Sequence, residues 1–358
     1  MSESALELSV YFGERDHSGG RLLADVLMDT FARRGINTSV LLRGTEGFGL
    51  RHRLLSEGSL TLSEDLPLLA VALDAPDRIE SLLQDVRAVL ANGLITLERA
   101  RLIGGPRHES SLDDGEREAK LTLYLGRGQR AGGAPAHVAA VQCLHRHGLD
   151  GASVLLGLDG TTGGVRRRAG VARSNDDVPL MVVSVGDTRA LARALPELTA
   201  MFAQPRIKLE RVRVCKRDGV ALASPDFAAQ PANDLAFWQK LVIYSGERSR
   251  HGGEPLHVAL VRRLRREGAA GASVLRGIWG YHGDHAPHGE RFWSLARHVP
   301  VLSVLLDTPA NMRRWYEIVD ELTDETGLVT SELVPALRAG GGELVHGGLA
   351  LAEPRRPA

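Results

Sequence analysis

Two short stretches of the sequence combine an arginine, a pair of glycines and an aromatic ring at the same spacing. Both read Arg-Gly-x-x-Gly followed by the aromatic residue, and backbone N–H groups left bare by glycine can cradle a phosphate. The arginine fork could pair with an anionic group while the ring stacks on a base. A tight turn in which glycine supplies positive φ explains the same pattern without a ligand. The residues are Arg43, Gly44, Gly47 and Phe48 in the first stretch, and Arg276, Gly277, Gly280 and Tyr281 in the second.

A glycine-rich segment before a predicted helix is a second candidate anion site. Gly13 is followed by Gly19-Gly20, and a helix N-terminus after such a turn attracts anions. The segment lacks the Lys-Ser/Thr of a P-loop and the spacing of the dinucleotide fingerprint, so we interpret it first as a long β-to-α turn and keep the phosphate site as an alternative. It begins with an adjacent Glu–Arg pair whose side chains point to opposite faces of an extended chain. One member of each pair is therefore expected to reach the neighbouring repeat, as an ion pair between repeats or as a ligand contact. These pairs are Glu14 and Arg15, and Glu247 and Arg248.

Three histidines form a candidate metal-binding pattern. His282, His285 and His288 follow H-x2-H-x2-H spacing with Asp284 among them, and imidazole with carboxylate suits Zn²⁺ or Cu²⁺. Glycine and proline interrupt the stretch, and no helix orients the side chains. We therefore interpret it first as a polar loop whose histidines titrate, and keep the metal site as an alternative.

A basic loop and two cysteines complete the chemically notable residues. The loop is interpreted as a solvated basic surface, with an acidic partner or a phosphate as the alternative. Cys143 and Cys215 lie far apart in sequence and predict two free thiols in a reducing compartment. No serine or cysteine nucleophile has a base placed by a recognisable motif, so the chain is predicted not to be an enzyme. The basic residues are Arg166, Arg167, Arg168 and Arg173.

Composition sets the broad class of the protein. The chain has 358 residues, with 44 Lys and Arg against 44 Asp and Glu. A balanced charge gives no global attraction to nucleic acid or to an anionic membrane. No charged-then-apolar leader follows Met1 and no apolar run approaches membrane-spanning length. The sequence thus predicts a cytoplasmic protein that does not bind nucleic acid.

The elements that must position these residues occur three times. Adding 113 (Gly13 to Gly126) or 233 (Gly13 to Gly246) converts a position in the first copy into its counterpart in the others without a gap. Such self-similarity at a fixed period is the mark of repeated units. Six glycines of each copy align: Gly13, Gly19, Gly20, Gly35, Gly44 and Gly47 with Gly126, Gly132, Gly133, Gly148, Gly157 and Gly160, and with Gly246, Gly252, Gly253, Gly268, Gly277 and Gly280.

Each copy reads as strand, helix, strand, strand, helix, strand. Apolar residues alternate in the strands and recur at helical spacing in the helices. This βαββαβ order predicts a ferredoxin-like unit, in which helices cover one sheet face and leave the other open. We expect an α+β protein in which three open faces pack together as an intramolecular pseudo-trimer, so that the chain is a monomer. The predicted domains are residues 5–103, 119–218 and 237–338, and a disordered tail covers 340–358.

The sequence resembles the PII-like family known as domain of unknown function 190. The resemblance lies in YFGERDHSGGRLLAD, LLRGTEGFG, LSEDLP and GLITLE of the first copy and in YSGERSRHGGEPL and GASVLRGIWGYHG of the third. It implies a ferredoxin-like fold, trimeric assembly, a flexible loop after strand two and a regulatory role like that of PII signalling proteins. It also implies a partner such as a membrane transporter or channel, fluoride exporters among them.

Three functions follow from this reading. The first is a regulatory protein that binds a small anionic ligand, such as an adenine nucleotide, in clefts between repeats, and that acts on a partner through the loops after strand two. Leu156 and Thr161 replace the arginine and the aromatic ring in the second copy, so two competent clefts and one degenerate cleft are expected. The second is a divalent-metal-binding protein that resembles the cation-tolerance trimers. The third is a scaffold without a ligand.

Overall fold

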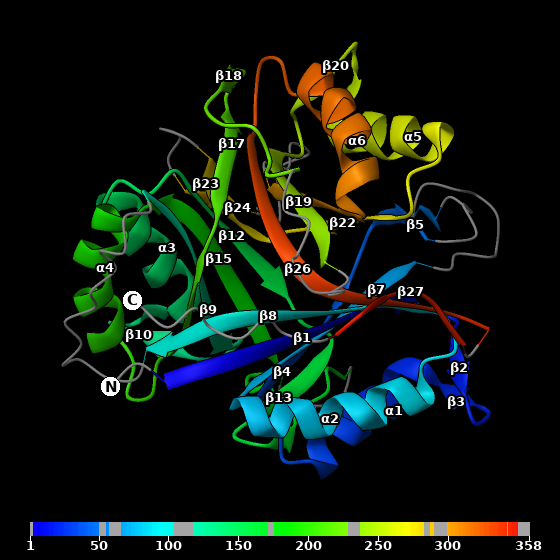
Figure 1. Ribbon diagram of the computed structural model, residues 1–358. Coiled ribbons are helices and arrows are strands. Elements are labelled where there is room, and N and C mark those ends of the chain that lie inside the picture. Colours follow the sequence, from blue (N-terminus) through cyan, green and yellow to red (C-terminus); the bar gives the residue numbers. More distant parts are fainter. Residues whose placement is uncertain are drawn as a thin grey trace, which may run out of the picture.

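The chain folds into three repeats of mixed α and β structure. The computed structural model describes residues 3–49, 55–56, 66–103, 117–170, 175–227, 237–282, 287–289, 299–341 and 343–349. Within these residues there are six helices, and the strand pairings are antiparallel. Figure 1 shows the helices as three pairs on the outside, at the bottom (α1, α2), left (α3, α4) and top (α5, α6), around a centre of strands. The mixed class and the threefold repetition agree with the sequence prediction.

Unit 1 is a four-stranded antiparallel sheet with two helices on one face. The strands lie in the order β4-β7-β1-β8. Leu6, Leu8 and Val10 alternate along β1 and pack with the helices in one buried cluster, as strand periodicity requires. The elements are β1 Glu3–Gly13, β2 His17–Ser18, β3 Arg21–Leu22, α1 Leu23–Arg33, β4 Thr38–Arg43, β5 Glu46–Phe48, β6 Leu55–Ser56, β7 Pro67–Asp74, α2 Pro76–Val89 and β8 Gly93–Ile103.

Units 2 and 3 repeat this order. Their sheets run β12-β15-β9-β16 and β22-β25-β19-β26. Unit 2 contains β9 Glu118–Gly126, β10 Arg130–Ala131, β11 Ala134–Pro135, α3 Ala136–Arg146, β12 Gly151–Leu156, β13 Asp159–Thr162, β14 Val165–Arg166, β15 Pro179–Asp187, α4 Thr188–Ala200, β16 Arg206–Arg211, β17 Arg213–Arg217 and β18 Val220–Ala221. Unit 3 contains β19 Phe237–Gly246, β20 Arg250–His251, β21 Glu254–Pro255, α5 Leu256–Glu267, β22 Ala272–Arg276, β23 Trp279–His282, β24 His288–Gly289, β25 Pro300–Asp307, α6 Pro309–Leu322, β26 Leu328–Gly340 and β27 Glu343–Gly348.

The short strand after strand two of each unit extends the sheet of another unit. β5 of unit 1 pairs with β22 of unit 3, β23 of unit 3 pairs with β12 of unit 2, and β13 of unit 2 pairs with β4 of unit 1. Each pairing covers a strand edge that would otherwise present unpaired backbone groups. The three seams therefore close into a ring.

The last strands of the units form a second set of connections. The end of β8 pairs with the start of β16, β17 pairs with the start of β26, and the end of β26 pairs with the start of β8. Every unit is thus hydrogen-bonded to both of the others at two places. All long strands belong to one continuous sheet as a result.

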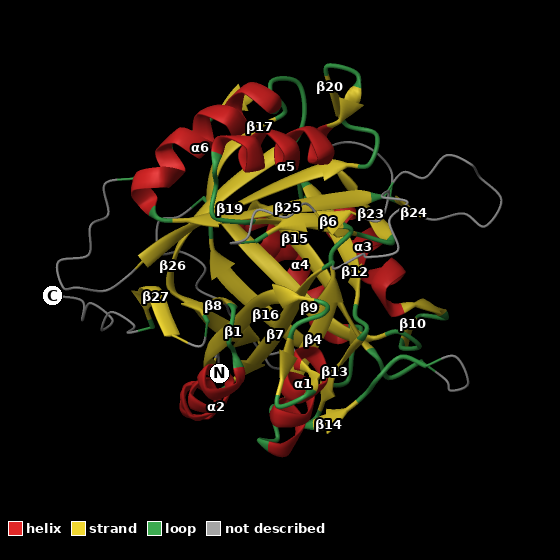
Figure 2. Ribbon diagram, turned by 90° about the vertical axis from the view of Figure 1, so that its right-hand side faces the viewer, coloured by secondary structure: helices red, strands yellow, loops and turns green. Residues whose placement is uncertain are grey.

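Apolar residues form three outer cores and one shared core. Each outer core fills the space between one sheet and its own helix pair. The fourth core combines residues of all three units, including Val71, Val183 and Val304 at equivalent positions of the third strands. In Figure 2 the strands occupy the interior and the helices lie outside them. The inner face of each sheet is therefore buried by the other units.

A charged cluster lies inside this shared core. On the first strands it contains Glu7, Lys120 and Lys240, and directly opposite them on the last strands lie Glu98, Glu210 and Glu332. Unit 2 adds Lys208, where the other units have threonine. None of these side chains is more than 9% exposed. Ionised groups persist at such depth only when they are paired.

Pairing within the cluster crosses between units. Glu7 lies opposite Glu98 in the same sheet, a like-charge pair that repels. Lys208 of unit 2 contacts Glu7, and Lys240 of unit 3 donates to Glu98 at 2.6 Å. Lys120 of unit 2 lies 2.7 Å from Glu332 of unit 3. Unit 1 therefore depends on cations from both other units.

Part of the segment predicted to be a disordered tail is a strand. β27 pairs with the end of β26 after a turn in which Gly341 has a φ of +66°. Leu344 and Val345 favour a strand, and the glycine allows the left-handed turn that a hairpin needs. The prediction was wrong for residues 343–348, because the glycine-rich composition of the segment masked a short hairpin.

Candidate functional site

The arginines of the predicted turns are held by glutamates of their own units. Arg43 donates to Glu14 through Nε at 3.1 Å and Nη2 at 3.0 Å. Arg276 and Glu247 repeat the contact at 3.0 and 3.3 Å. These forked pairs are about one-third exposed or less. The arginines of the turns and the glutamates of the Glu–Arg pairs therefore meet, but within one unit. The expected ion pair between repeats was wrong for Glu14 and Glu247, because an arginine of the same unit already binds each carboxylate.

In unit 2 a different contact forms at the equivalent turn. Arg127 occupies the position of Glu14, and Leu156 that of Arg43. The Arg127 guanidinium donates to the carbonyl of Gly157. The missing forked pair in unit 2 is therefore replaced by a side-chain to backbone contact at the same turn.

The glycines of the turns allow close approach between units. A Cβ on Gly47 would lie 2.6 Å from the carbonyl oxygen of Ala272, and one on Gly280 would lie 2.0 Å from that of Ala152. Gly44 and Gly277 face backbone oxygens of the neighbouring unit at 2.8 and 3.1 Å in the same way. Glycine is needed here because β5 and β23 pair with strands of other units.

The aromatic rings enter the cores of neighbouring units. Phe48 of unit 1 is 3% exposed and belongs to the outer core of unit 3. Tyr281 of unit 3 is 3% exposed, belongs to the outer core of unit 2, and donates from its hydroxyl to the Leu149 carbonyl at 3.0 Å. Neither ring presents a face to a ligand. The cavity beside Tyr281 measures about 20 Å³, which is room for a single water.

The other predicted candidates are distributed as follows. Arg15 and Arg248 are exposed and lie in turns, next to their glutamate neighbours. Gly19 and Gly20 have φ values of +57° and +77° and form the two-residue turn of the β2–β3 hairpin, as primed turns require. His282 contacts Asp218 at 2.9 Å, whereas His285 and the side chain of His288 lie outside the described residues.

The basic loop of unit 2 is partly neutralised by unit 1. Arg166 contacts Asp159 of its own unit and Asp25 and Asp29 of α1, and Arg168 contacts Asp25 at 2.8 Å. These ion pairs hold the loop at the seam between β13 and β4. Arg173 lies outside the described residues.

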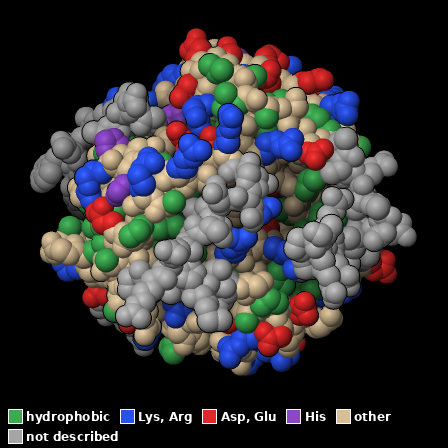
Figure 3. Space-filling view, turned by 60° about the vertical axis from the view of Figure 1, so that its left-hand side comes forward, with side chains coloured by type: hydrophobic (Ala, Val, Ile, Leu, Met, Phe, Trp, Pro, Cys, Tyr) green, Lys and Arg blue, Asp and Glu red, His purple; other side chains and the backbone are tan. Residues whose placement is uncertain are grey.

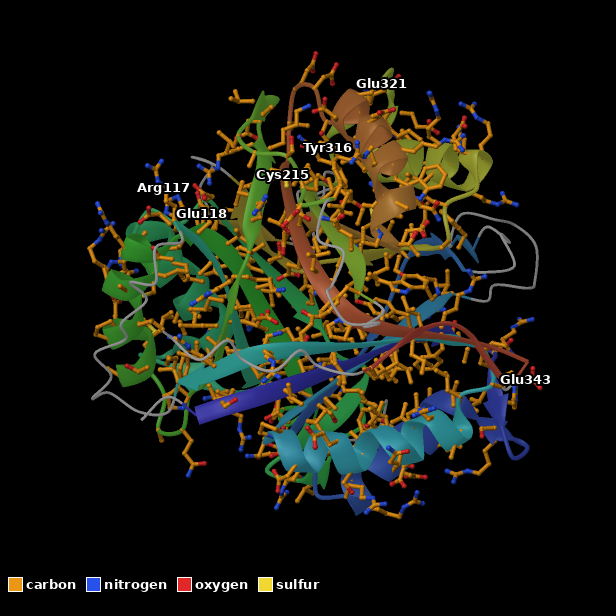
Figure 4. All side chains as sticks on the ribbon, in the orientation of Figure 1. Arg117, Glu118, Cys215, Tyr316, Glu321 and Glu343 are labelled. Carbon is orange, nitrogen blue, oxygen red and sulfur yellow. The ribbon has the colours of Figure 1, made fainter. Side chains whose placement is uncertain are left out.

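A larger cavity lies between units 2 and 3, and its described lining includes none of the site residues predicted from the sequence. It has a volume of about 680 Å³, within the range of small-molecule sites. Its walls are the start of β9, the β16–β17 junction and the face of β19 and β26, and Figure 4 shows Arg117 and Glu118 beside β17 at its rim. We call it the arginine pocket; its charged lining residues are Arg117, Arg211, Arg213, Arg217, Glu118, Asp226 and Glu332.

In the arginine pocket the arginines outnumber the carboxylates that are not already paired with a cation. Glu332 is already paired with Lys120 and Lys240. Glu118 accepts from Arg217 at 3.0 Å, and burial raises the pKa of Glu118 although the guanidinium opposes the shift. Figure 3 shows Lys and Arg side chains on one face of the molecule, with Asp and Glu side chains among them. The lining therefore favours an anion.

Buried polar atoms in the arginine pocket lack partners among the described residues. Gln239 is 0% exposed, and its Nε2 donates to Ser331 Oγ at 2.8 Å, but its Oε1 accepts no hydrogen bond. Oε2 of Glu118 and Nε of Arg217 are also unpartnered. Buried polar groups are satisfied in most native sites, so such a group deserves an explanation, and a bound molecule is one.

A family model with the description "Uncharacterized ACR" matches the chain three times, at residues 5–102, 118–214 and 238–336. The chain belongs to the DUF190 family. Its three tandem DUF190 units coincide with the three structural repeats, so the predicted resemblance is confirmed.

A solved structure, described as the crystal structure of aspartate kinase from Synechocystis, is similar to the chain at 11% identity and a TM-score of 0.25. The match covers 95% of this chain and 46% of that protein. A score of this size carries no argument about the DUF190 units. None of the helices within the described residues has the length and apolar character needed to cross a membrane.

One signal in the sequence of the second DUF190 unit points to the arginine pocket. Arg211 and Arg213 are spaced by two, which places both on one face of a strand. Arg117 and Gln239 come from distant segments, and only the seam between units 2 and 3 brings them together. That part of the site was outside the reach of sequence reasoning.

We expect the two thiols of this DUF190 protein to be unreactive in the folded state. Burial raises the pKa of Cys215 from 9.0 to about 12, and Figure 4 shows this residue on β17 near Tyr316 of α6. Burial likewise raises the pKa of Cys143 to about 12. A thiol reagent at pH 8 should label neither cysteine until urea unfolds the chain. The protein is first treated with a chelator, so that a bound metal ion cannot be what protects the thiols.

The same shifts predict a pH dependence of stability. The unfolded thiols lose their protons near pH 9, whereas the folded thiols hold them to about pH 12. Unfolding in this range releases protons, so the free energy of unfolding should fall as pH rises above 9. Urea midpoints at pH 8 and pH 10 measure the effect. A higher midpoint at pH 10, or rapid labelling of the folded protein, would contradict the burial of these groups.

Proposed function

We propose that the chain is a PII-like regulatory protein that binds a small anionic ligand in the arginine pocket. The proposed architecture is an intramolecular pseudo-trimer of ferredoxin-like units. Its support is the cyclic pattern of seams and the equivalent sheet order of the three units. The ligand would bind between units 2 and 3 and change how these units are held together.

The observation that carries this proposal is a cavity of about 680 Å³ with arginines at its rim and unpartnered polar atoms in its wall. Arg117, Arg211 and Arg213 suit phosphate or carboxylate oxygens, because a guanidinium offers two parallel donors. An adenine nucleotide carries phosphate oxygens of this kind and is the ligand class we favour.

The site differs from the one expected from the glycine turns. Those turns serve the seams, with Phe48 and Tyr281 in neighbouring cores. The proposed site is still at a junction of units. Unit 3 has Leu333 and Pro335 where unit 2 has Arg211 and Arg213, and unit 1 has Arg99 and Arg101 there, but unit 2 has Ala119 where unit 3 contributes Gln239. A single ligand per chain is therefore proposed.

A partner protein would respond to this ligand. The resemblance to PII-like proteins makes a membrane transporter or channel the expected partner. The loops after strand two are the expected contacts, and much of their length lies outside the described residues. No enzymatic role is proposed.

The test is a melting-temperature screen with ATP, ADP, pyrophosphate and inorganic phosphate. A ligand that binds the folded state at 100 times its dissociation constant adds about 2.7 kcal/mol, which corresponds to a rise of a few degrees. We expect the rise to disappear in the double variant Arg211→Ala, Arg213→Ala, because both side chains are exposed at the pocket rim and their loss should leave the fold intact.

The matched control is Arg43→Ala, which removes the forked pair with Glu14 far from the pocket. This variant should keep the response. A response lost in Arg43→Ala and kept in the double variant would move the site to the strand-two turn. No response to any probe would leave the scaffold function in its place.

A further inference from the structure

Three side chains with metal-binding atoms converge on the outer surface of unit 2. Cys143 on α3 and His147 at its C-terminal cap are one helical turn apart, and Glu197 comes from α4 alongside. The thiol, imidazole and carboxylate donor atoms all lie within 4.8 Å of one another. Nε2 of His147 is 3.0 Å from Oε2 of Glu197.

We propose that Cys143, His147 and Glu197 form a Zn²⁺ site. Residues four apart on a helix share one face, so the two helix ligands can reach the same ion. Tetrahedral zinc with nitrogen and oxygen ligands at about 2.0–2.2 Å holds those ligands roughly 3.3 Å apart, close to the observed spacing of imidazole and carboxylate. Water would take the fourth position.

An ion can reach this site from solvent. The side chains of His147 and Glu197 are 25% and 40% exposed, while Cys143 is buried beneath them. The Arg146 guanidinium binds the other oxygen, Oε1, of Glu197. It would remain there and orient the carboxylate, as outer partners of metal ligands do.

Binding replaces a proton by the ion. Without metal the Cys143 thiol holds its proton, because burial and the nearby Glu197 carboxylate raise its pKa. The Zn²⁺ ion would take the thiolate lone pair as the S–H bond breaks, and the proton would pass to solvent. The charges of thiolate and carboxylate then balance the two charges of the ion.

In unit 1 the positions equivalent to Cys143, His147 and Glu197 carry residues that cannot all bind zinc. Thr30, Arg34 and Asp85 occupy the equivalent positions, and Arg34 pairs with Asp85 at 2.6 Å. Unit 2 keeps the carboxylate and the contact between helices, but it exchanges threonine for cysteine and arginine for histidine. Both exchanges add a zinc ligand.

The experiment titrates the chelator-treated full chain with Co²⁺. A thiolate ligand produces a sulfur-to-cobalt charge-transfer band in the near ultraviolet, and tetrahedral coordination produces strong visible bands. We expect both bands in the wild type and their displacement by Zn²⁺. In His147→Arg, which recreates the ion pair of unit 1 and so preserves the helix contact, Zn²⁺ binding should weaken more than about 100-fold.

Cys143→Ser should abolish the charge-transfer band, and Cys215→Ser, which alters the other buried thiol, should keep it. Absence of the band in the wild type, or its survival in His147→Arg, would overturn the proposal. This readout does not depend on the arginine pocket, so the two proposals stand or fall separately.

Discussion

Lys208→Thr is expected to lower the free energy of unfolding by about 3–5 kcal/mol, the usual cost of removing one partner from a buried ion pair. Lys208 is 2% exposed and contacts Glu7 and Glu210. Without it, the one hydrogen-bond donor left to the Glu7 side chain among the described residues is the Tyr124 hydroxyl, at 2.8 Å. The variant residue is the one that units 1 and 3 already carry at this position, Thr96 and Thr330, so it suits the strand at this place.

The charge balance of the cluster explains why this cation matters. Four carboxylates face three ammonium groups, as Glu7, Glu98, Glu210 and Glu332 surround the lysines. Burial raises the pKa of Glu98, which favours a proton on this carboxyl and offsets the excess negative charge. Removal of Lys208 adds a second unbalanced charge that no neighbour can neutralise.

Adding Glu7→Lys to Lys208→Thr should restore most of the lost stability. The double variant places a lysine opposite the last-strand glutamate in unit 1, as in units 2 and 3. Urea unfolding of wild type, both single variants and the double variant gives the coupling energy. Strictly additive effects, or a loss below about 1 kcal/mol for Lys208→Thr, would contradict the role assigned to the cluster. The exposed pair of Arg34 and Asp85 is the control, and Arg34→Ala should leave the urea midpoint nearly unchanged.

Gly280→Ala is expected to destabilise the seam between units 3 and 2 by about 2–4 kcal/mol. The backbone at Gly280 has a φ of +152°, which an L side chain rarely adopts. An added Cβ would lie 2.0 Å from the Ala152 carbonyl oxygen, so β23 must move away from β12. Urea unfolding measures the loss, and faster proteolysis of the variant would report an opened seam.

Gly49→Ala is the matched control, because a Cβ there meets nothing within 4 Å and the residue has ordinary backbone angles. Gly160→Ala, with a Cβ 2.1 Å from the Ser39 carbonyl, should behave like Gly280→Ala at another seam. Equal stability of the Gly49 and Gly280 variants would show that the strand pairing between units does not need glycine.

The three repeats could be predicted from the sequence because glycine recurs at positions where the backbone requires it. Gly44, Gly157 and Gly277 align without a gap, and all three lie at seams. Alternating residues such as Leu6 and Leu8 predicted the strands, because one face of each sheet packs on its own helices. Local pattern therefore established the unit and its repetition.

The contacts between units could not be predicted from the sequence. Phe48 and Tyr281 have the same type and spacing whether they stack on a ligand or fill the core of another unit, and only the pairing of β5 and β23 decides between these. Glu7 reads as the solvent side of a half-buried strand, although it is 5% exposed. The arginine pocket depends on segments more than a hundred residues apart, so no local window contains it.

The order in which the seams close has a consequence for synthesis on the ribosome. β5 leaves the exit tunnel early, but its partner β22 follows about 230 residues later, as the contact of Thr45 with the Val274 carbonyl shows. At about 5–20 residues per second this delay lasts roughly 10–50 s. Until its partners in units 2 and 3 emerge, the nascent first unit exposes a carboxylate-bearing apolar surface and unpaired strand edges, a natural substrate for holding chaperones.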